Sequence, residues 1–497
     1  MTVVLDPRTR VLDGGRTLVG GDPWRVLRLT EGGAAVVRGL LAGAGTGPGA
    51  GGGDTAARAL ARQLIDAGLA HPRATPVPCG EVTVVIPVHD RTEQLERCLA
   101  SVFEADRPGR VIVVDDGSRD AAGVDAVCAR MGAELIRRDR CSGPAAARNT
   151  ALARVESGLV ALLDSDCVPE QGWLSLLCGT LAVDPGLGAV APRVRPLEER
   201  WEGLSPSGRQ TFPASRGNRA LARFAAVRSP LDLGPWPSLV RPGGRVAYVP
   251  TAAVLVRREA LGEAATPFDP ALRYGEDVDL VWRMLDGGWS IRYQPEAVVR
   301  HGEPGRLRPW LARRFRYGSS AGPLARRHPK RLAPVVIHPP SATVLGAAAA
   351  AVGSRRVPSA AAALPVALHA VRVARSLSYH GVSARTGAAL GLQGLGESGA
   401  ALGRATTMLA PPLVAAGLLH ARTRRPALAL LLAAPVRDCA RLRPSLDPVR
   451  FATLSIADDV SYGAGVWAGA LRARTVRPLR PRINRRVSPG RGLSTLR

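Results

Sequence analysis

Between residues 82 and 163, four short apolar segments leave little choice of fold. The segments at 82–88, 111–114, 134–136 and 159–163 are rich in strand-forming side chains, and amphipathic stretches with helical spacing separate them. Runs that are apolar throughout are typical of parallel strands whose two faces are both covered by helices. We therefore expect an α/β domain, and in such sheets ligands bind at the carboxyl ends of the strands.

Polar residues follow the first two of these strands directly. The first strand ends around Pro87, and the second runs into Asp115 and Asp116 before a Gly-Ser turn. A carboxylate at a strand tip can accept hydrogen bonds from a base or a ribose, and the glycine lets a ligand approach closely. An ordinary Asp-Gly turn that closes a strand explains these residues equally well.

A second acidic pair, Asp164 and Asp166, comes directly after the fourth strand. Two carboxylates two residues apart can both reach one divalent cation, Mn²⁺ or Mg²⁺, and leave coordination sites for diphosphate oxygens. Such a cation neutralises the charge that develops when a nucleoside diphosphate departs. The D-x-D pattern alone is common in surface turns, but its place at the end of an apolar strand, downstream of another acidic strand end, indicates a metal site. His301, at the end of a later apolar run, is a candidate third ligand, although a lone His is as often a core or surface residue.

Two further motifs place charged residues at helix starts. Arg148 lies near the start of a helix that opens at Gly143, where a guanidinium could face a diphosphate; a solvated helical arginine is the alternative. Glu276 and Asp277 begin an amphipathic helix, and transfer of a sugar with inversion needs a carboxylate that takes a proton from the acceptor hydroxyl.

Asp277 is our candidate for that base, with Glu276 and Asp279 as competitors. Acidic residues are favoured at any helix N-terminus, which accounts for Glu276 or Asp279 without chemistry. Asp279 and Arg283 also form an ordinary pair one helical turn apart.

The remainder of the chain suggests further regions. Residues 1–74 predict a small module, with strands at 10–12 and 17–19, a helix at 31–42 capped by Thr30, a Gly-rich loop at 43–53 and a helix at 55–68. Residues 75–81 then predict a linker and 82–331 the α/β domain.

Residues 332–470 are Ala-rich and helical. Their apolar patches lie at 342–352, 359–371, 405–419 and 427–436, and none of these is a clean membrane span. They predict packed amphipathic helices or helices lying on a membrane. The tail, 471–497, is basic and without acids, and could meet an anionic membrane surface.

Charge and cysteine content exclude some classes of protein. The net charge is +26, with 67 basic and 41 acidic residues, which favours an anionic partner without choosing one. The seven cysteines are scattered and show no disulfide framework or zinc-ligand spacing.

The first 30 residues lack the uninterrupted apolar stretch of a secretory signal. We therefore expect the catalytic part in the cytoplasm, with attachment to the inner face of the membrane left open.

Taken together, the motifs VTVVIPVHD, VVDDGS, AARN, LLDSD, GEDVDLVWR and VVRH resemble the family 2 glycosyltransferases over residues 82–301. The resemblance implies the GT-A fold, an α/β mixed sheet with helices on both faces. It also implies that Asp115 and Asp116 hold the nucleoside of a nucleotide-sugar donor, with Pro87 and Arg148 also on the donor. Asp164 and Asp166 would hold the metal and diphosphate with His301, and Asp277 would be the base.

The N-terminal segment is similar to the PqqD-like peptide-recognition modules, which are small and winged-helix-like. The likeness rests on residues 29–34 and the helix at 59–69. Its fusion to a family 2 transferase resembles the glycosyltransferases of mycofactocin systems. This implies transfer of glucose from UDP-glucose, in β-1,4-linked repeats, onto the peptide-derived redox cofactor mycofactocin or its precursor. One alternative is a polysaccharide or lipid-linked acceptor at the membrane. Nucleic-acid binding ranks last, because aromatic residues make up only 4% of the chain.

Overall fold

The structure is a computed structural model that describes residues 2–42, 53–197, 200–205, 208–213, 219–264, 266–354, 358–484 and 495–496. The chain divides into two compact units. Unit 1 comprises Met1–Arg8, Gly21–Pro23 and Leu40–Gly305, and unit 2 comprises Thr9–Gly20, Trp24–Gly39 and Arg306–Arg497. The segment boundaries given above for 1–74, 75–81, 82–331, 332–470 and 471–497 stay predictions. Most of the Gly-rich loop at 43–53 and part of the basic tail lie outside the described residues.

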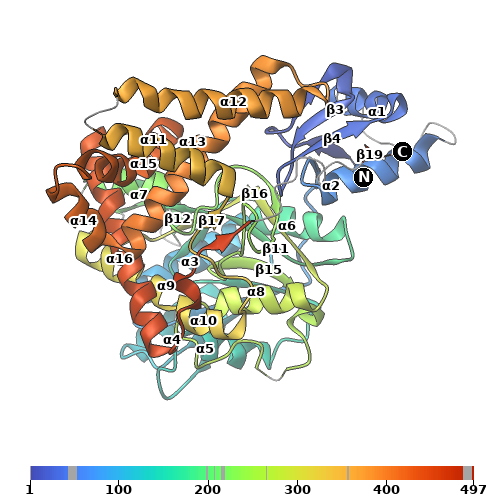
Figure 1. Cartoon of the computed structure of the whole chain (residues 1–497). Coiled ribbons are helices and arrows are strands. Elements are labelled where there is room, and N and C mark those ends of the chain that lie inside the picture. The colour runs from blue at the N-terminus through green and yellow to red at the C-terminus, as the bar shows by residue number, and fades with distance from the viewer. Residues whose placement is uncertain are drawn as a thin grey trace. The chain divides into compact units, whose positions relative to one another are not determined.

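The centre of unit 1 is a mixed sheet in which, among the described residues, nine strands take part (Figure 1). The strand order is β10-β16-β11-β15-β9-β6-β7-β8, and β14 pairs with β16. The four predicted strands are confirmed as neighbours that run parallel in the order β9-β6-β7-β8, and β15 joins them antiparallel to β9. The strands are β6 (Val82–Val88), β7 (Arg110–Asp115), β8 (Glu134–Arg137), β9 (Leu159–Leu163), β10 (Cys167–Pro169), β11 (Leu187–Pro196), β14 (Ser238–Leu239), β15 (Ala253–Arg257) and β16 (Ser290–His301).

Helices cover the sheet because its strands are apolar on both sides. Alternate residues of β6, such as Val84 and Ile86, pack in a core with side chains of α3, α4 and α6. Val85, which points to the opposite face, is also buried, and α5 packs against β6 and β7. The helices of unit 1 are α2 (Gly53–Asp66), α3 (Thr92–Ala105), α4 (Ala121–Met131), α5 (Pro144–Leu152), α6 (Trp173–Ala182), α7 (Arg219–Arg228) and α8 (Glu276–Asp286). A hairpin of β12 (Arg200–Ser205) and β13 (Gly208–Pro213) completes the unit.

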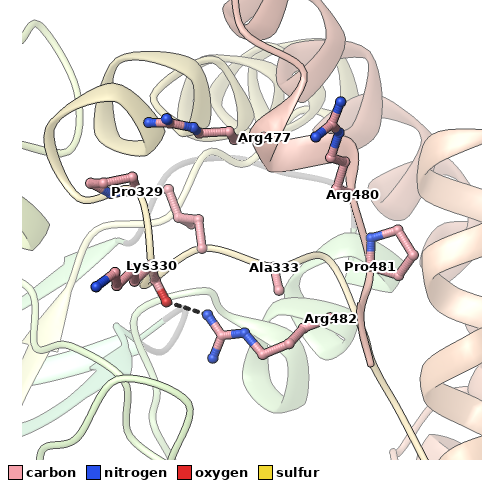
Figure 2. A pocket seen from close by; sticks show the side chains of 8 residues that line it. Pro329, Lys330, Ala333, Arg477, Arg480, Pro481 and Arg482 are labelled. Carbon is pink, nitrogen blue, oxygen red and sulfur yellow. Dashed lines mark hydrogen bonds between the residues drawn. The ribbon is translucent and has the colours of Figure 1, made fainter. Parts of the chain in front are cut away.

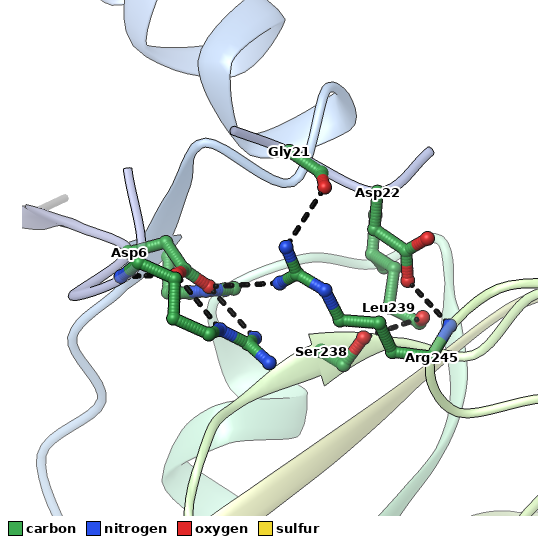
Figure 3. A network of polar contacts seen from close by, with 8 residues as sticks. Asp6, Gly21, Asp22, Ser238, Leu239 and Arg245 are labelled. Carbon is green, nitrogen blue, oxygen red and sulfur yellow. Dashed lines mark hydrogen bonds and ion pairs between the residues drawn. The ribbon is translucent and has the colours of Figure 1, made fainter. Parts of the chain in front are cut away.

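The N-terminal residues of unit 1 are held to the loop after β14 by a polar network around the buried residues Asp6 and Asp22 (Figure 3). β1 (Val3–Leu5) pairs antiparallel with β5 (Ala70–Pro72), which places His71 Nε2 2.8 Å from Asp6 Oδ2. The guanidinium of Arg245 donates to the Gly21 carbonyl and lies 3.5 Å from the Asp6 carboxylate. Burial raises the pKa of Asp6, but the hydrogen bonds from His71 and Arg8 outweigh it and hold that pKa well below its usual value. Asp6 is therefore ionised, and its buried charge is matched by arginine.

Unit 2 contains the predicted strands and first helix of the N-terminal segment. β2 (Arg10–Leu12), β3 (Thr17–Gly20) and β4 (Arg25–Leu29) form an antiparallel meander, with β19 (Thr495–Leu496) parallel to β4. The predicted cap is confirmed, since the Thr30 hydroxyl accepts the Gly33 N–H at the start of α1 (Glu31–Leu41). Val19 and Val26 pack against Leu377 and Val382, so the meander shares a core with residues far along the chain.

The predicted helical region from residue 332 is confirmed (Figure 1). The helices of unit 2 from residue 306 onward are α9 (Leu307–Ser319), α10 (Ala321–Arg327), α11 (Pro339–Gly353), α12 (Ala363–Ser378), α13 (Ala384–Leu409), α14 (Pro411–Leu419), α15 (Arg424–Leu442) and α16 (Pro448–Arg472). β17 (Val336–Ile337) and β18 (Arg482–Ile483) pair in parallel.

Within the described residues, one helical segment, Ala360–Ser378, is long and apolar enough to cross a membrane, with a mean hydropathy of 1.2. α13 and α14 pass the same test only as a pair, with a bend of 101° between them. Ala360–Ser378 extends past the apolar patch expected at 359–371 and includes Arg372 and Arg375. Length and composition alone therefore admit a span here, and they do not require one.

Helices α9 and α16 approach closely through glycines. A Cβ at Gly465 would lie 2.0 Å from the Phe315 carbonyl oxygen, and one at Gly469 would lie 2.2 Å from that of Ser319. No real Cβ tolerates such distances, so only glycine permits this packing.

Gly465→Ala is expected to destabilise unit 2 by about 1–3 kcal/mol, because the added methyl group overpacks the α9–α16 contact. Gly394→Ala, in α13, is the matched control, since among the described residues no heavy atom lies within 4 Å of a Cβ placed there. Alanine should stabilise that helix by about 1 kcal/mol. Thermal unfolding should move the two Tm values in opposite directions, and a shift of the same sign would contradict the close packing.

Candidate active site

The candidate metal ligands meet where β9 and β16 end and β10 begins. Asp164 follows β9, and the short turn to β10 brings Asp166 alongside it. β10 then pairs antiparallel with β16, so that Cys167 lies opposite His301. One ligand atom from each of Asp164, Asp166 and His301 lies within 4.8 Å of the other two. The structure thus brings together the three residues expected to hold a cation.

The chemistry of these three side chains fits a divalent metal. Two carboxylates and an imidazole form an O,O,N set of the kind that Mn²⁺ accepts. His301 is only 7% exposed, and its Nδ1 has no hydrogen-bond partner among the described residues. Its Nε2 lies 3.4 Å from Asp166 Oδ1. Burial raises the pKa of Asp166, but His301 and Arg91 outweigh burial and hold that pKa below its usual value, so the carboxylate is ionised.

Arg148 connects this group to the acidic helix start. Its guanidinium is buried, donates to Asp164 over 2.6 Å and to Glu276 over 3.2 Å, and lies 5.5 Å from the centre of the Phe268 ring. Burial lowers the pKa of Arg148, but the carboxylates of Asp164 and Glu276 outweigh burial and raise it. Arg148 therefore remains charged and fixes the distance between the two acidic sites.

Asp277 lies beside this ion pair, at the first turn of α8. Its Oδ1 accepts the Val278 N–H at 2.8 Å, and part of its side chain reaches solvent. Burial first, and then the charge of Glu276, raise the pKa of Asp277 to about 7. Burial also raises the pKa of Glu276, against the lowering effect of Arg148. A carboxyl group that titrates near neutral pH is suited to accept and release a proton.

The three acids in the first turn of α8 are in different environments. Asp279 is 1% exposed and bonds Arg283 Nε over 2.9 Å, while Glu276 is bound to Arg148. Asp277 is thus the acid of this turn that combines solvent access with a pKa near 7.

Asp115 and Asp116 organise the loop that follows β8. Asp115 is fully buried, accepts the Ser118 N–H and is ion-paired to Arg137. Asp116 accepts the N–H groups of Ser142 and Gly143 and is ion-paired to Arg138. Both carboxylates therefore have partners in this structure, and their contact with a nucleoside stays a prediction.

The turn after β7 requires a glycine at position 117. Gly117 has a φ of 73°, and a Cβ on it would lie 2.9 Å from the Cys141 nitrogen. In this structure the close approach that the glycine permits is made by the chain's own backbone at Arg140 and Cys141. Pro87 is buried in β6 opposite Val114 on β7.

Several residues of the site were missed from sequence. Arg91, at the start of α3, is ion-paired to Asp166. The side-chain amide of Asn149 accepts the backbone N–H of Phe268 and donates to the backbone carbonyl of Phe268. Arg91 directly follows a polar strand end, which was a usable signal. Arg137 is the last residue of the short edge strand β8 and Arg138 follows it, and neither showed a pattern of its own.

Comparison with known proteins supports an enzyme of carbohydrate transfer. Residues 83–230 match the family described as Glycosyl transferase family 2. A protein of Mycobacterium tuberculosis named pre-mycofactocin glycosyltransferase is 37% identical over 491 residues, which is 97% of this chain and 97% of that protein. Glycosyltransferase AglE of Haloferax volcanii is 30% identical over 232 residues, covering 41% of this chain and 75% of that protein.

Among solved structures, a mannosyltransferase of Pyrobaculum calidifontis in complex with GDP-Man and Mn²⁺ is 19% identical. It matches with a TM-score of 0.36 over 74% of this chain and 90% of that one, which is a loose similarity. The family match, by contrast, includes the strand ends at Asp115 and Asp164, and the mycobacterial relative matches almost the entire chain. The predicted GT-A fold class is confirmed, and the chain is a glycosyltransferase that belongs to glycosyl transferase family 2.

Proposed function

We propose that this glycosyltransferase moves glucose from UDP-glucose onto mycofactocin or its peptide-derived precursor, with inversion, and extends a β-1,4-linked chain. The acceptor is proposed from the similarity to the mycobacterial pre-mycofactocin glycosyltransferase, which extends along 97% of both chains. The geometry of the site supports the reaction type, because a carboxyl group with a pKa near 7 lies beside a cluster suited to a cation.

In this proposal Asp164, Asp166 and His301 hold Mn²⁺ or Mg²⁺ together with the donor diphosphate. The cation would neutralise charge on the departing nucleoside diphosphate. Arg148 keeps Asp164 and Glu276 in place, and Asp115 and Asp116 position the nucleoside side of the donor. The O,O,N donor set and the buried His301 are the features that fit such a group.

Asp277 acts as the base. It accepts the proton of the acceptor hydroxyl while the hydroxyl oxygen bonds to the anomeric carbon and the bond from that carbon to the phosphate oxygen breaks. Attack from the face opposite the leaving group inverts the configuration at that carbon. A base with a pKa of about 7 is largely ionised just above neutrality and still strong enough to take the proton.

A direct test uses purified protein with UDP-glucose, Mn²⁺ and the peptide-derived acceptor. The expected products are a ladder of hexose additions by mass spectrometry and β-anomeric signals by proton NMR. Replacing UDP-glucose with UDP-galactose or GDP-mannose should lower transfer strongly. An α-linked product would contradict inversion, and an unchanged rate with GDP-mannose would contradict the donor assignment.

A second acceptor class is favoured by one observation. Unit 2 carries exposed aliphatic side chains, including Leu364 and Leu368 within the segment Ala360–Ser378. A lipid-linked sugar at the membrane would suit such a surface. An assay that offers both acceptors decides between them, since a strict requirement for the lipid-linked sugar would replace the small-cofactor proposal.

The location of the enzyme and the role of the N-terminal segment belong to the same proposal. We place the catalytic unit in the cytoplasm, with peripheral attachment to the inner face of the membrane. Residues 1–74 would bind the peptide part of the acceptor, as their likeness to peptide-recognition modules implies. Binding of the precursor peptide to the full chain, measured by calorimetry, tests this role separately from sugar transfer.

A further inference from the structure

Unit 2 contains a shallow basic pocket of ≈ 390 Å³ that is open to solvent, far along the chain from the proposed active-site residues (Figure 2). It lies between the segment after α10 and the segment after α16. The lining residues are Pro329, Lys330, Leu332, Ala333, Arg477, Arg480, Pro481 and Arg482. We name it the basic cavity.

The charge of the basic cavity is uncompensated. Four of its lining residues are cations and none is acidic. None of the four is paired to a carboxylate among the described residues, and Arg482 donates instead to the Lys330 carbonyl, which links the two segments that line the cavity. Four cations around one open space create a local positive potential that attracts an anion. Arginines recognise phosphate oxygens through paired N–H donors.

Aliphatic side chains on the same segments are exposed to solvent. Val336 is 41% exposed, Val476 is 54% exposed and Ile483 is 53% exposed. Val476 directly precedes Arg477, and Ile483 directly follows Arg482 and pairs with Ile337 in the β17–β18 ladder. Cations beside exposed aliphatic groups are the combination that lies in the headgroup region of an anionic bilayer.

We propose that the basic cavity binds the phosphate of an anionic phospholipid headgroup, with Val336, Val476 and Ile483 resting against the adjacent acyl chains. A soluble phosphate compound would satisfy the arginines and would give these aliphatic groups no partner. The cavity thus attaches unit 2 to a lipid surface. This rests on the peripheral membrane attachment proposed above and names the site responsible for it, and it is independent of the sugar acceptor and of the proposed reaction.

The test is sedimentation of the full chain with vesicles of phosphatidylglycerol and phosphatidylcholine, compared with phosphatidylcholine alone. R477Q/R480Q should lower the partition onto phosphatidylglycerol vesicles about tenfold or more, because each surface arginine contributes to binding an anionic leaflet. Both side chains are exposed, so folding should be unaffected, and the Tm of the variant verifies this. V476S/I483S should also weaken vesicle binding and leave binding of inorganic phosphate unchanged.

R424Q/R425Q is the matched control. It removes the same charge from the exposed start of α15, away from the cavity residues in sequence and in their contacts. An equal loss of vesicle binding in this control would show diffuse attraction and overturn the proposal. So would a cavity variant that loses inorganic phosphate in calorimetry and still binds vesicles normally, because the occupant would then be a soluble phosphate.

Discussion

Replacing Asp277 with asparagine is expected to lower kcat for sugar transfer by about 10²- to 10⁴-fold, the usual range for loss of a general base. Asparagine keeps the shape of the side chain and cannot accept the proton. Donor binding, measured by calorimetry with UDP-glucose and Mn²⁺, should change little, because the proposed donor contacts come from other elements of the fold. The matched control is Asp286→Asn at the other end of α8, where an exposed carboxylate is lost.

The pH dependence of the wild-type enzyme follows from the same group. Burial and Glu276 raise the pKa of Asp277 to about 7, and only the ionised form can take a proton, so the rate should rise with pH. The midpoint should lie at or below about 7, since a bound cation favours the ionised carboxylate. Glu276→Gln removes one of the charges that raise this pKa and should move the midpoint to lower pH.

As pH rises, the contribution of Asp277 to the free energy of unfolding should fall, while the rate of sugar transfer rises. The folded-state pKa of Asp277 lies above its unfolded value, so its contribution to stability is present at low pH and is lost as pH rises through about 7. Asp277→Asn should therefore raise Tm relative to wild type at pH 8 more than at pH 5. A variant that transfers sugar at the wild-type rate, or that is less stable than wild type at pH 8, would exclude Asp277 as the base.

The second large effect is expected for Asp166→Asn, which should weaken Mn²⁺ binding by more than about 100-fold, since loss of even an outer residue costs up to that amount. The variant loses one of three oxygen and nitrogen ligands and leaves Arg91 without its carboxylate partner. Electron paramagnetic resonance of bound Mn²⁺ measures this directly, without reference to turnover. Metal-dependent transfer should fall with it, and high Mn²⁺ should restore part of the rate.

The control for Asp166→Asn is Asp139→Asn, which removes an exposed carboxylate from the loop after β8. His301→Gln tests the third ligand and should weaken Mn²⁺ binding in the same assay. Normal Mn²⁺ affinity in both Asp166→Asn and His301→Gln would show that the cation, if used, is held elsewhere.

Much of unit 1 could be predicted from local sequence, because its strands are buried on both faces. The limits of β6 and β9 match the predicted segments, and the β7 and β8 segments each fall within one residue of the prediction. Such strands show a continuous apolar run that ends where the chain meets solvent, and so the polar strand ends carrying Asp164 and His301 were visible. The alternation of strands and helices then predicted a sheet with these strand ends at the same edge.

The partners of these residues could not be predicted in the same way. Arg91, Arg137 and Arg138 neutralise the acidic strand ends, and each comes from a loop or edge strand whose path depends on tertiary packing. Arg148 was expected to face a diphosphate and is found between Asp164 and Glu276. A bound donor would compete for these ion pairs through its own negative charge, and no local sequence pattern encodes the outcome.

The division of the N-terminal segment between the two units was also invisible in sequence. Two of its strands, β2 and β3, and both of its helices were recognised from spacing and from the Thr30 cap, whereas β1, β4 and β5 were not predicted. The packing partners of the recognised strands lie hundreds of positions away. Val19 and Val26 contact Leu377 and Val382, and nothing near either pair marks the other.

That long-range packing bears on how the protein is made. The Thr17 hydroxyl bonds the His380 carbonyl, 363 positions further along the chain. At translation speeds of about 5–20 residues per second, the β2–β4 meander waits roughly 20 to 70 s on the ribosome before this partner emerges. Throughout that interval its apolar side has no cover from the nascent polypeptide, which makes it a natural client for chaperones. Slowing elongation between codons 40 and 380 should therefore reduce the yield of folded enzyme.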